Sequence, residues 1–427
     1  APMIQGTEHE YTLFSHKLNP RGIDPHRLAL DLLWRSNLAA EGEFLMNGSR
    51  AYFDVGHLEI ATCEVLTPRD VVLYEKAGER IVDTVRLRLE DAHNVKINAY
   101  KNNTDPDGVS YGSHENYCVP RQIPFPDAYL ETLVPHLVSR MIYAGAGDFI
   151  DHQYVLSPCA YLTSQLVSGG NLSNTGVLHT RDEPHADPER FRRLHVIIGD
   201  ALMSEPAILL RHFATQAILE AIHDGAVKDP PKLRNPLEDM WDNVESPTPD
   251  NWSFATKDGK RITPMQVQRY YLDIVEPRVD TPEQKQALKM WEEILDEFEG
   301  DFDTDKLARR IDWVARLREI ERLKEIKGKE EFVELAACKQ FGELSPSRGL
   351  YWRRIQDGLC DRVVTDDEVV KAMEQPPKTR AAARTEILTQ YEVTTADWSE
   401  VRVLTEDGGT ERLRLLDPYE WDPEVTT

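Results

Sequence analysis

The stretch RAYFDV, residues 50–55, constrains the fold more than any other part of the sequence. Successive side chains of a β-strand point to opposite faces of the sheet. As a strand, this stretch places Arg50, Tyr52 and Asp54 on one face, and the apolar residues Ala51, Phe53 and Val55 on the other. The pattern predicts a strand with one side on a core and a polar side that is either a half-exposed surface or the wall of a site.

Four further runs of alternating residues, punctuated by Gly, Asn and Asp, accompany this strand at residues 3–14, 58–66, 95–105 and 110–119. Such punctuation between short strands is typical of a mostly antiparallel sheet. Apolar residues at spacings of three and four predict helices over 69–94 and 204–226, the second with Ser204 as N-cap. We expect an α+β fold.

The second half of the chain is more charged. Residues 281–337 favour helices, with 311–331 expected to be a solvated amphipathic helix, and the Pro- and Asp-rich stretch 236–252 is expected to be a loop. The composition changes after Cys360, so we predict a large domain over 1–362 and a small C-terminal domain over 363–427.

Composition narrows the class of protein. The formal charge is −24, which argues against nucleic acid as a partner because phosphate binding needs a basic surface. No run approaches the about 18 apolar residues of a membrane helix, and no signal peptide is evident, so we expect no membrane contact and a cytoplasmic location. The five cysteines contain no CxxC pair, which favours reduced thiols over disulfides or a zinc site.

Paired carboxylates suggest a metal site. Alternation places Glu8 and Glu10 on one face of the first strand, and Glu59 and Glu64 follow Asp54 closely. Neighbouring carboxylates repel one another, and oxygen ligands suit Mg²⁺, which also contacts nucleotide phosphates. The alternative is an exposed strand face without a metal.

Two other groups could take part. His114 and Glu115 end a turn-rich segment, where the histidine is either structural or a ligand. Residues 181–195 carry the densest basic patch, a candidate for an anionic substrate or phosphate unless its arginines pair with nearby acids; its members are Arg181, His185, Arg192, Arg193 and His195. Because no P-loop motif is present, a nucleotide would have to bind through a metal and the sheet.

Several longer motifs resemble the family of Pup ligases and depupylases (Pup deamidases), relatives of glutamine synthetase and glutamate–cysteine ligase. They extend from the first strand to the C-terminal domain and include GTEHEY, NGSRAYFDVG, EKAGER, YKNNTD, YGSHENY, HTRDEPHADPERFRRLHVIIGD, RGLYWRR and EQPPKTRA. The resemblance implies a glutamine-synthetase-like large domain, in which helices pack on a curved, mostly antiparallel sheet, and a small C-terminal domain.

The resemblance also implies roles for single residues. Asp54 matches the catalytic aspartate of the family. Mg²⁺ would be held by Glu8, Tyr52 and Glu59, with Glu10, His114 and Glu115 as further candidates, and ATP, or ADP plus phosphate, would contact Arg50, Thr62 and Trp398. The implied partner is a small acidic ubiquitin-like modifier and its lysine conjugates, and Arg181, Arg192, Arg193, Arg353 and Arg354 are candidates for binding it.

Different motifs favour different branches of the family, and the two branches catalyse opposite directions of the reaction. Motifs such as EKAGER resemble the depupylases, whereas the DVG motif and the lack of a long insertion after the first strand resemble the ligases. Both branches have HPEY where this chain has HLEI at residues 57–60, so we expect the wall that faces the substrate to differ from theirs. We expect a depupylase- or deamidase-like hydrolase; the alternatives are an ATP-dependent ligase that works through an acyl-phosphate and a non-catalytic binding protein.

Overall fold

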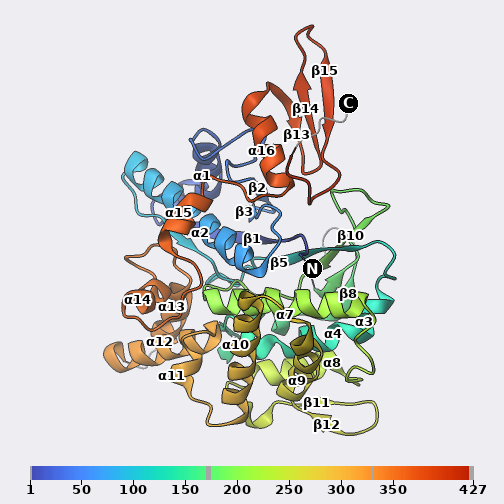
Figure 1. The fold of residues 1–427 in the computed structure, drawn as a ribbon. Helices are drawn as coiled ribbons and strands as arrows, with labels where there is room; N and C mark the ends of the chain where they lie inside the picture. The colour runs from blue at the N-terminus through green and yellow to red at the C-terminus, as the bar shows by residue number, and fades with distance from the viewer. Residues whose placement is uncertain (1, 170–174, 329–330, 423–427) are drawn as a thin grey trace.

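An eight-stranded sheet crosses the middle of the computed structural model, which describes residues 2–169, 175–328 and 331–422 (Figure 1). Its strands are β1 (Gln5–Phe14), β2 (Arg50–Asp54), β3 (His57–Ala61), β4 (Asn98–Tyr100), β5 (Ser113–Pro120), β8 (Gln165–Ser168), β9 (Gly176–His179) and β10 (Phe191–Val196). Their order is β2-β3-β1-β5-β10-β9-β8, with β4 paired to β1 outside this path. All pairs are antiparallel except β8 with β9, which confirms the mostly antiparallel sheet.

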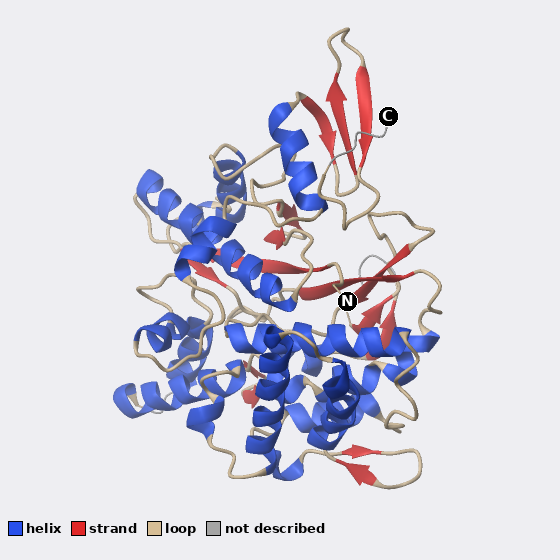
Figure 2. Cartoon of the chain, viewed as in Figure 1, coloured by secondary structure: helices blue, strands red, loops and turns tan. Residues whose placement is uncertain are grey.

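Helices cover one face of this sheet, and further helices form a layer beneath them (Figures 1 and 2). The helices α2 (Pro68–His93) and α7 (Glu205–His223) pack against each other below the sheet, close to the boundaries expected from sequence. Thr67 caps α2 by accepting from the Asp70 N–H, and Ser204 occupies the N-cap position of α7 without a side-chain cap bond. The central strand β1 buries Tyr11 against this helical side, while Leu58 and Ile60 of β3 face the same core.

The other helices and short strands complete the large domain. They are η1 (Asn19–Arg21), α1 (Pro25–Trp34), α3 (Asp127–Thr132), α4 (Val134–Ser139), α5 (Met141–Ala144), β6 (Asp148–Ile150), β7 (Gln153–Val155), α6 (Pro158–Leu162), α8 (Pro236–Val244), η2 (Pro249–Asn251), β11 (Phe254–Ala255), β12 (Arg261–Ile262), α9 (Pro264–Val275), η3 (Glu276–Arg278), α10 (Pro282–Glu299), α11 (Thr304–Leu307), α12 (Asp312–Lys327), α13 (Glu331–Phe341), α14 (Leu350–Gln356) and α15 (Asp366–Ala372). None of the helices in the described ranges has both the length and the apolar composition needed to span a bilayer.

Three local predictions are wrong. The expected loop 236–252 begins with α8, because Leu237, Met240, Trp241 and Val244 form one apolar face at helical spacing. The helix expected over 311–331 ends at Lys327, and its first half is buried rather than solvated, with Trp313 1% exposed; residues 329 and 330 lie outside the described ranges. Val55 does not share the apolar face of β2, since the strand ends at Asp54 and Val55 is 81% exposed.

The C-terminal segment adds a second, smaller core above the sheet (Figure 1). Helix α16 (Arg380–Gln390) packs on a three-stranded antiparallel sheet of β13 (Val393–Ala396), β14 (Glu400–Leu404) and β15 (Thr410–Arg414). Phe44 of the large domain joins this core, whereas Val369 and Ala372 of α15 are buried in the main core. The division after residue 362 stays a prediction.

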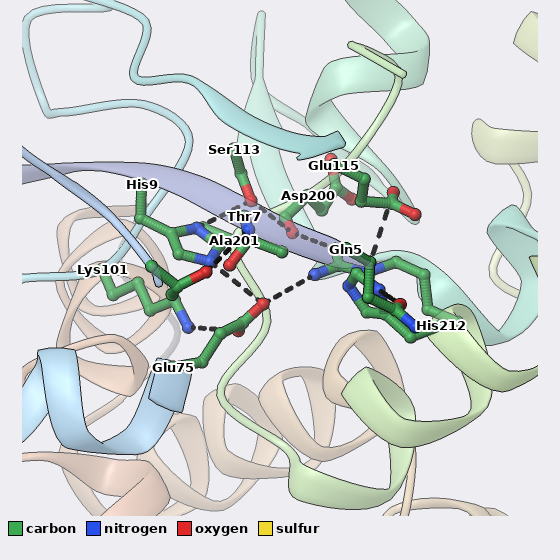
Figure 3. A network of polar contacts seen from close by, with 12 residues as sticks. Gln5, Thr7, His9, Glu75, Lys101, Ser113, Glu115, Asp200, Ala201 and His212 are labelled. Carbon is green, nitrogen blue, oxygen red and sulfur yellow. Dashed lines mark hydrogen bonds and ion pairs between the residues drawn. The ribbon is translucent and has the colours of Figure 1, made fainter. Parts of the chain in front are cut away.

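A network of polar side chains fixes β1 and β5 from below (Figure 3). The His9 ring lies 3.0 Å from the Ser113 hydroxyl and 3.1 Å from a Glu75 carboxylate oxygen, and Glu75 also pairs with Lys101 at 3.1 Å. Burial lowers the pKa of His9, although Glu75 opposes this shift. These buried contacts tie β1 and β5 to α2 and to the segment after β4, which limits how far the two strands can shift.

Candidate functional site

The polar face of the sheet gathers most of the residues predicted to carry chemistry. The strand register places Glu10 opposite Glu59 and Glu59 opposite Tyr52, so these side chains share one face. The Tyr52 hydroxyl donates to a Glu59 oxygen at 2.6 Å. The alternation of side chains along each strand thus places the predicted polar wall on the face of the sheet that α2 and α7 do not cover.

Three carboxylates form the first cluster on this wall. One oxygen each of Glu10, Asp54 and Glu59 lies within 4.8 Å of the others. Burial raises the pKa of Glu59, and the negative charges of Glu8, Glu10 and Asp54 raise it further, against the hydrogen bond from Tyr52. Burial and the negative charges of Glu8, Glu59 and Asp54 also raise the pKa of Tyr52, so its hydroxyl stays protonated. Among the described residues, no lysine or arginine pairs with these three carboxylates.

Glu8 is the centre of a second cluster. His114 and His195 lie 3.8 Å and 3.9 Å from its carboxylate, and Arg193 donates to it at 3.1 Å. Burial alone would raise the pKa of Glu8, but Arg193 and His114 offset burial and hold this pKa well below its ordinary value. Burial and Arg193 lower the pKa of His195, so a neutral imidazole lies beside the Glu8 carboxylate.

The donor set fits a divalent metal. Three carboxylate oxygens within 4.8 Å suit a hard cation such as Mg²⁺, and the second cluster adds one carboxylate and two imidazoles. A cation would offset the repulsion that raises the pKa of Glu59. Glu10 and Glu59 lie in the first cluster, Tyr52 donates to Glu59, and Glu8 and His114 lie in the second cluster. The role of these residues as metal ligands stays a prediction.

A pocket adjoins the second cluster, between the sheet and the C-terminal segment. It is lined by residues of β1 and β10, by the segment after β3 and by the small domain, among them Gly6, Glu8, Thr62, Arg193, Arg380 and Trp398. The Thr62 hydroxyl accepts from the Thr7 N–H at 2.9 Å and is fixed at the wall. Thr62 and Trp398 therefore lie in one pocket beside the carboxylates, as a nucleotide site would require.

Buried ion pairs connect the small domain to this pocket. Arg384 is fully buried, donates twice to Glu64 at 2.8 Å and donates once to the Trp398 carbonyl at 2.9 Å. Its guanidinium lies 5.0 Å from the centre of the Trp398 ring and 4.6 Å from that of Phe44. Arg380 donates to Glu64 at 2.8 Å as well. These contacts fix Trp398 against the large domain.

The predicted arginines differ in their surroundings. Arg50 pairs with Glu43 at 2.8 Å and with Asp397 at 3.4 Å, so it bridges β2 to the small domain beside Trp398. Arg192 pairs with Asp182 at 2.9 Å and lines the pocket. Arg181 is exposed and pairs with Glu183 at 3.4 Å. Ion pairing with nearby acids, the alternative weighed for the basic patch of residues 181–195, therefore applies to Arg181 and Arg192.

Four sequence-based expectations fail because of strand alternation or ion pairing. Glu115 points to the opposite face of β5 and pairs with Arg140 at 2.9 Å, so it is not a metal ligand. Glu64 is neutralised by two arginines. Arg354 is buried and pairs with Glu319, so it cannot line a docking groove. The changed residues of HLEI, Leu58 and Ile60, are both buried in the core, so they do not alter the substrate-facing wall.

Sequence reasoning missed several residues of the site. His57 lies across from Asp54 in the β2–β3 pair, is 2.8 Å from Glu10 and stacks on Tyr111 at 4.1 Å. Asn116 connects Glu8 to Arg193. Alternation along β5 and β3 could have identified both. The spacing of four between Arg380 and Arg384 also puts both on one face of a helix, a signal for a shared partner.

Comparison with known proteins agrees with this geometry. The family model for Pup-ligase protein matches residues 4–402. The chain is 36% identical over 404 residues to a depupylase of Acidothermus cellulolyticus, covering 89% of this chain and 79% of the relative. It is 35% identical over 403 residues to a Pup–protein ligase of Xylanimonas cellulosilytica, covering 89% and 87%.

Solved structures give the same result. The complex between the prokaryotic ubiquitin-like protein Pup and its ligase PafA matches with a TM-score of 0.87 and 28% identity, covering 99% of this chain and 90% of that one. PafA in complex with ADP matches with a TM-score of 0.80 and 27% identity, covering 97% and 93%. These matches confirm the expected α+β fold. The chain belongs to the Pup ligase family.

Proposed function

We propose that this protein is a Mg²⁺- and nucleotide-dependent hydrolase of the depupylase or deamidase type. Its substrate would be the side-chain amide of a C-terminal Gln in a small, Pup-like modifier, or the isopeptide bond that joins the modifier's C-terminal Glu side chain to a lysine. The similarity to depupylases and to a Pup-bound structure supports this class of substrate.

The position of Asp54 carries the proposal. Asp54 is the last residue of β2, partly exposed, and lies beside Glu10 and Glu59 at the end of the carboxylate wall. A reacting carbonyl at this wall would meet one accessible carboxylate and two that are better placed to hold a cation. Amide hydrolysis by a carboxylate requires one group that attacks the carbonyl or activates water and others that hold the metal.

The chemistry follows from these roles. Asp54 either takes a proton from a water molecule that attacks the carbonyl carbon, after which the C–N bond breaks, or attacks that carbon itself. In the second case the C–N bond breaks to leave an anhydride between Asp54 and the modifier, and water then hydrolyses this anhydride to regenerate the Asp54 carboxylate. The leaving nitrogen departs as ammonia or as the lysine amine after it gains a proton. Mg²⁺, when bound by Glu8, Glu10, Tyr52 and Glu59, would supply positive charge for the developing oxyanion. Glu8 also fixes Arg193 at the pocket, where Thr62 and Trp398 would hold the nucleotide.

A ligase is the second candidate, favoured by the similarity to PafA. In that direction ATP phosphorylates the side-chain carboxylate of the modifier's C-terminal Glu, and a lysine amine displaces phosphate while Asp54 accepts the amine proton. The same residues serve both directions, because bond formation and hydrolysis both take place at the same carbonyl carbon beside the same carboxylate wall.

One assay separates the directions. The protein is incubated with Mg²⁺-ATP and either a preformed modifier–lysine conjugate, or a modifier ending in Glu together with a lysine-bearing protein. We expect release of free modifier with little ATP consumption. ADP formed in proportion to new conjugate would select the ligase instead.

The Asp54→Asn variant tests the catalytic residue. We expect turnover to be lost while Mg²⁺-ADP binding persists, since asparagine keeps the shape but cannot act as base or nucleophile. Full activity of the variant would show that Asp54 has no such role, and loss of nucleotide binding would place Asp54 among the metal ligands.

A further inference from the structure

The turn that follows Asp54 has an unusual residue at its tip. Strand β2 ends at Asp54 and β3 begins at His57, leaving Val55 and Gly56 as a two-residue turn. Both have positive φ, 42° for Val55 and 97° for Gly56, the signature of a type I′ hairpin turn. The first position of this turn favours Asn, Asp or Gly.

Valine is poorly suited to this position. A β-branched side chain at positive φ is a conformational outlier, and Val55 is the only β-branched residue with positive φ in the part of the chain that the structure describes. Backbone strain of this kind persists at sites where it serves a function.

The side chain also gains little from its own fold. Val55 is 81% exposed, so it buries little apolar surface in the chain that carries it. A Cβ built on the neighbouring Gly56 meets no atom within 4 Å, which shows that the tip of the turn projects into open space. An apolar residue that is both strained and exposed, one position from the reacting carboxylate, is arranged to contact something outside the chain.

We propose that Val55 is a specificity residue that packs against the aliphatic stem of the lysine whose ε-nitrogen reacts beside Asp54. This inference rests on the proposed function. The four methylenes of a lysine side chain must pass the end of β2 for its nitrogen to reach Asp54, and the valine methyls offer them an apolar surface there. The modifier's own Gln or Glu side chain carries the same carbonyl in both reactions, so only the lysine stem distinguishes them.

The two reactions of the proposed function provide the test, because only one of them involves a lysine. Hydrolysis of a modifier–lysine conjugate is compared with deamidation of a modifier ending in Gln, which releases ammonia. Val55→Asn suits the turn and removes the apolar surface, and Val55→Ile keeps that surface as a matched control. Val55→Gly serves as a second variant if the asparagine protein does not fold.

We expect Val55→Asn to lower kcat/KM for the conjugate about tenfold, the loss expected when one or two buried methylenes lose apolar contact. In Val55→Asn, deamidation should stay within about twofold of wild type, because that reaction involves no lysine stem. Val55→Ile should keep both rates, because isoleucine retains the apolar surface. If the wild type proves to be a ligase, the same comparison is made between a lysine peptide and hydroxylamine as the accepting nucleophile.

The outcomes separate the two proposals. Equal losses in both reactions, or no loss in either, would overturn the role of Val55 while the proposed function stands. A wild-type protein inactive towards all of these substrates would overturn the proposed function and the inference with it.

Discussion

At the scale of single residues, charge balance distinguishes acids that are close in sequence. Glu59 lies among other carboxylates, which raise its pKa together with burial. Glu64, only five positions later, is as buried, yet two arginines lower its pKa to about 2 against the effect of burial. The first environment favours a cation that the chain does not supply, and the second is already neutralised.

Substitution of Glu64 should therefore change stability in a pH-dependent way. The pKa of Glu64 is about 2 in the folded protein and 4.5 ordinarily, so its contribution is present above pH 4.5 and is lost as pH falls towards 2. The difference corresponds to about 3 kcal/mol of stability at neutral pH. We expect Glu64→Gln to lose at least this amount in urea unfolding at pH 7, with the gap to wild type narrowing below pH 4.5.

A surface residue offers the control. Glu400 also lies between two arginines, Arg402 and Arg412, but both arginines are exposed to solvent and Glu400 is only partly buried. Exposed ion pairs contribute at most about 1 kcal/mol, so Glu400→Gln should change stability little at any pH. Equal losses of stability in Glu64→Gln and Glu400→Gln would contradict the prediction that burial strengthens the ion pairs of Glu64.

At the scale of elements, alternation predicted more than composition did. The wall of Glu8, Glu10, Tyr52, Asp54 and Glu59 follows from the period of two along β1, β2 and β3 together with the observed register, because a slip of one residue would turn the set of a strand to the opposite face. Composition misled at α8, where Pro and Asp suggested a loop although four apolar residues occur at helical spacing.

Helix α16 provides a prediction at this scale, because Arg384 fixes Trp398 through geometry that lysine cannot reproduce. Arg384 contacts Glu64, the carbonyls of Gly48 and Trp398, and two aromatic rings at once. We expect Arg384→Lys to raise the KM for nucleotide several-fold while kcat is largely kept, and to shift the fluorescence of Trp398. Arg402→Lys on exposed β14 is the matched control, and unchanged nucleotide affinity in Arg384→Lys would argue against the positioning role.

At the scale of the whole molecule, the sequence could predict the faces of strands but not the pairing of distant segments. The partners of Glu64 lie 316 and 320 positions later, and the contact that fixes Trp398 joins two cores. Such pairs depend on how the small domain packs on the sheet, which local periodicity does not encode. The family resemblance predicts that Trp398 contacts the nucleotide, and in the structure Arg384 links Trp398 to the large domain.

This link makes ligand binding a property of both domains. The pocket is lined by Thr62 of the large domain and Trp398 of the small one, so Mg²⁺-ADP should stabilise the two together. A ligand that binds only the folded state adds about 2.7 kcal/mol at a concentration of 100 times its Kd. We expect Mg²⁺-ADP to raise the Tm in a single transition, and EDTA to abolish most of the rise because Glu8 and Glu59 would then repel the phosphates. Glu59→Gln should reduce the shift and Asp54→Asn should keep it; an undiminished shift in EDTA would show that the carboxylate wall takes no part in nucleotide binding.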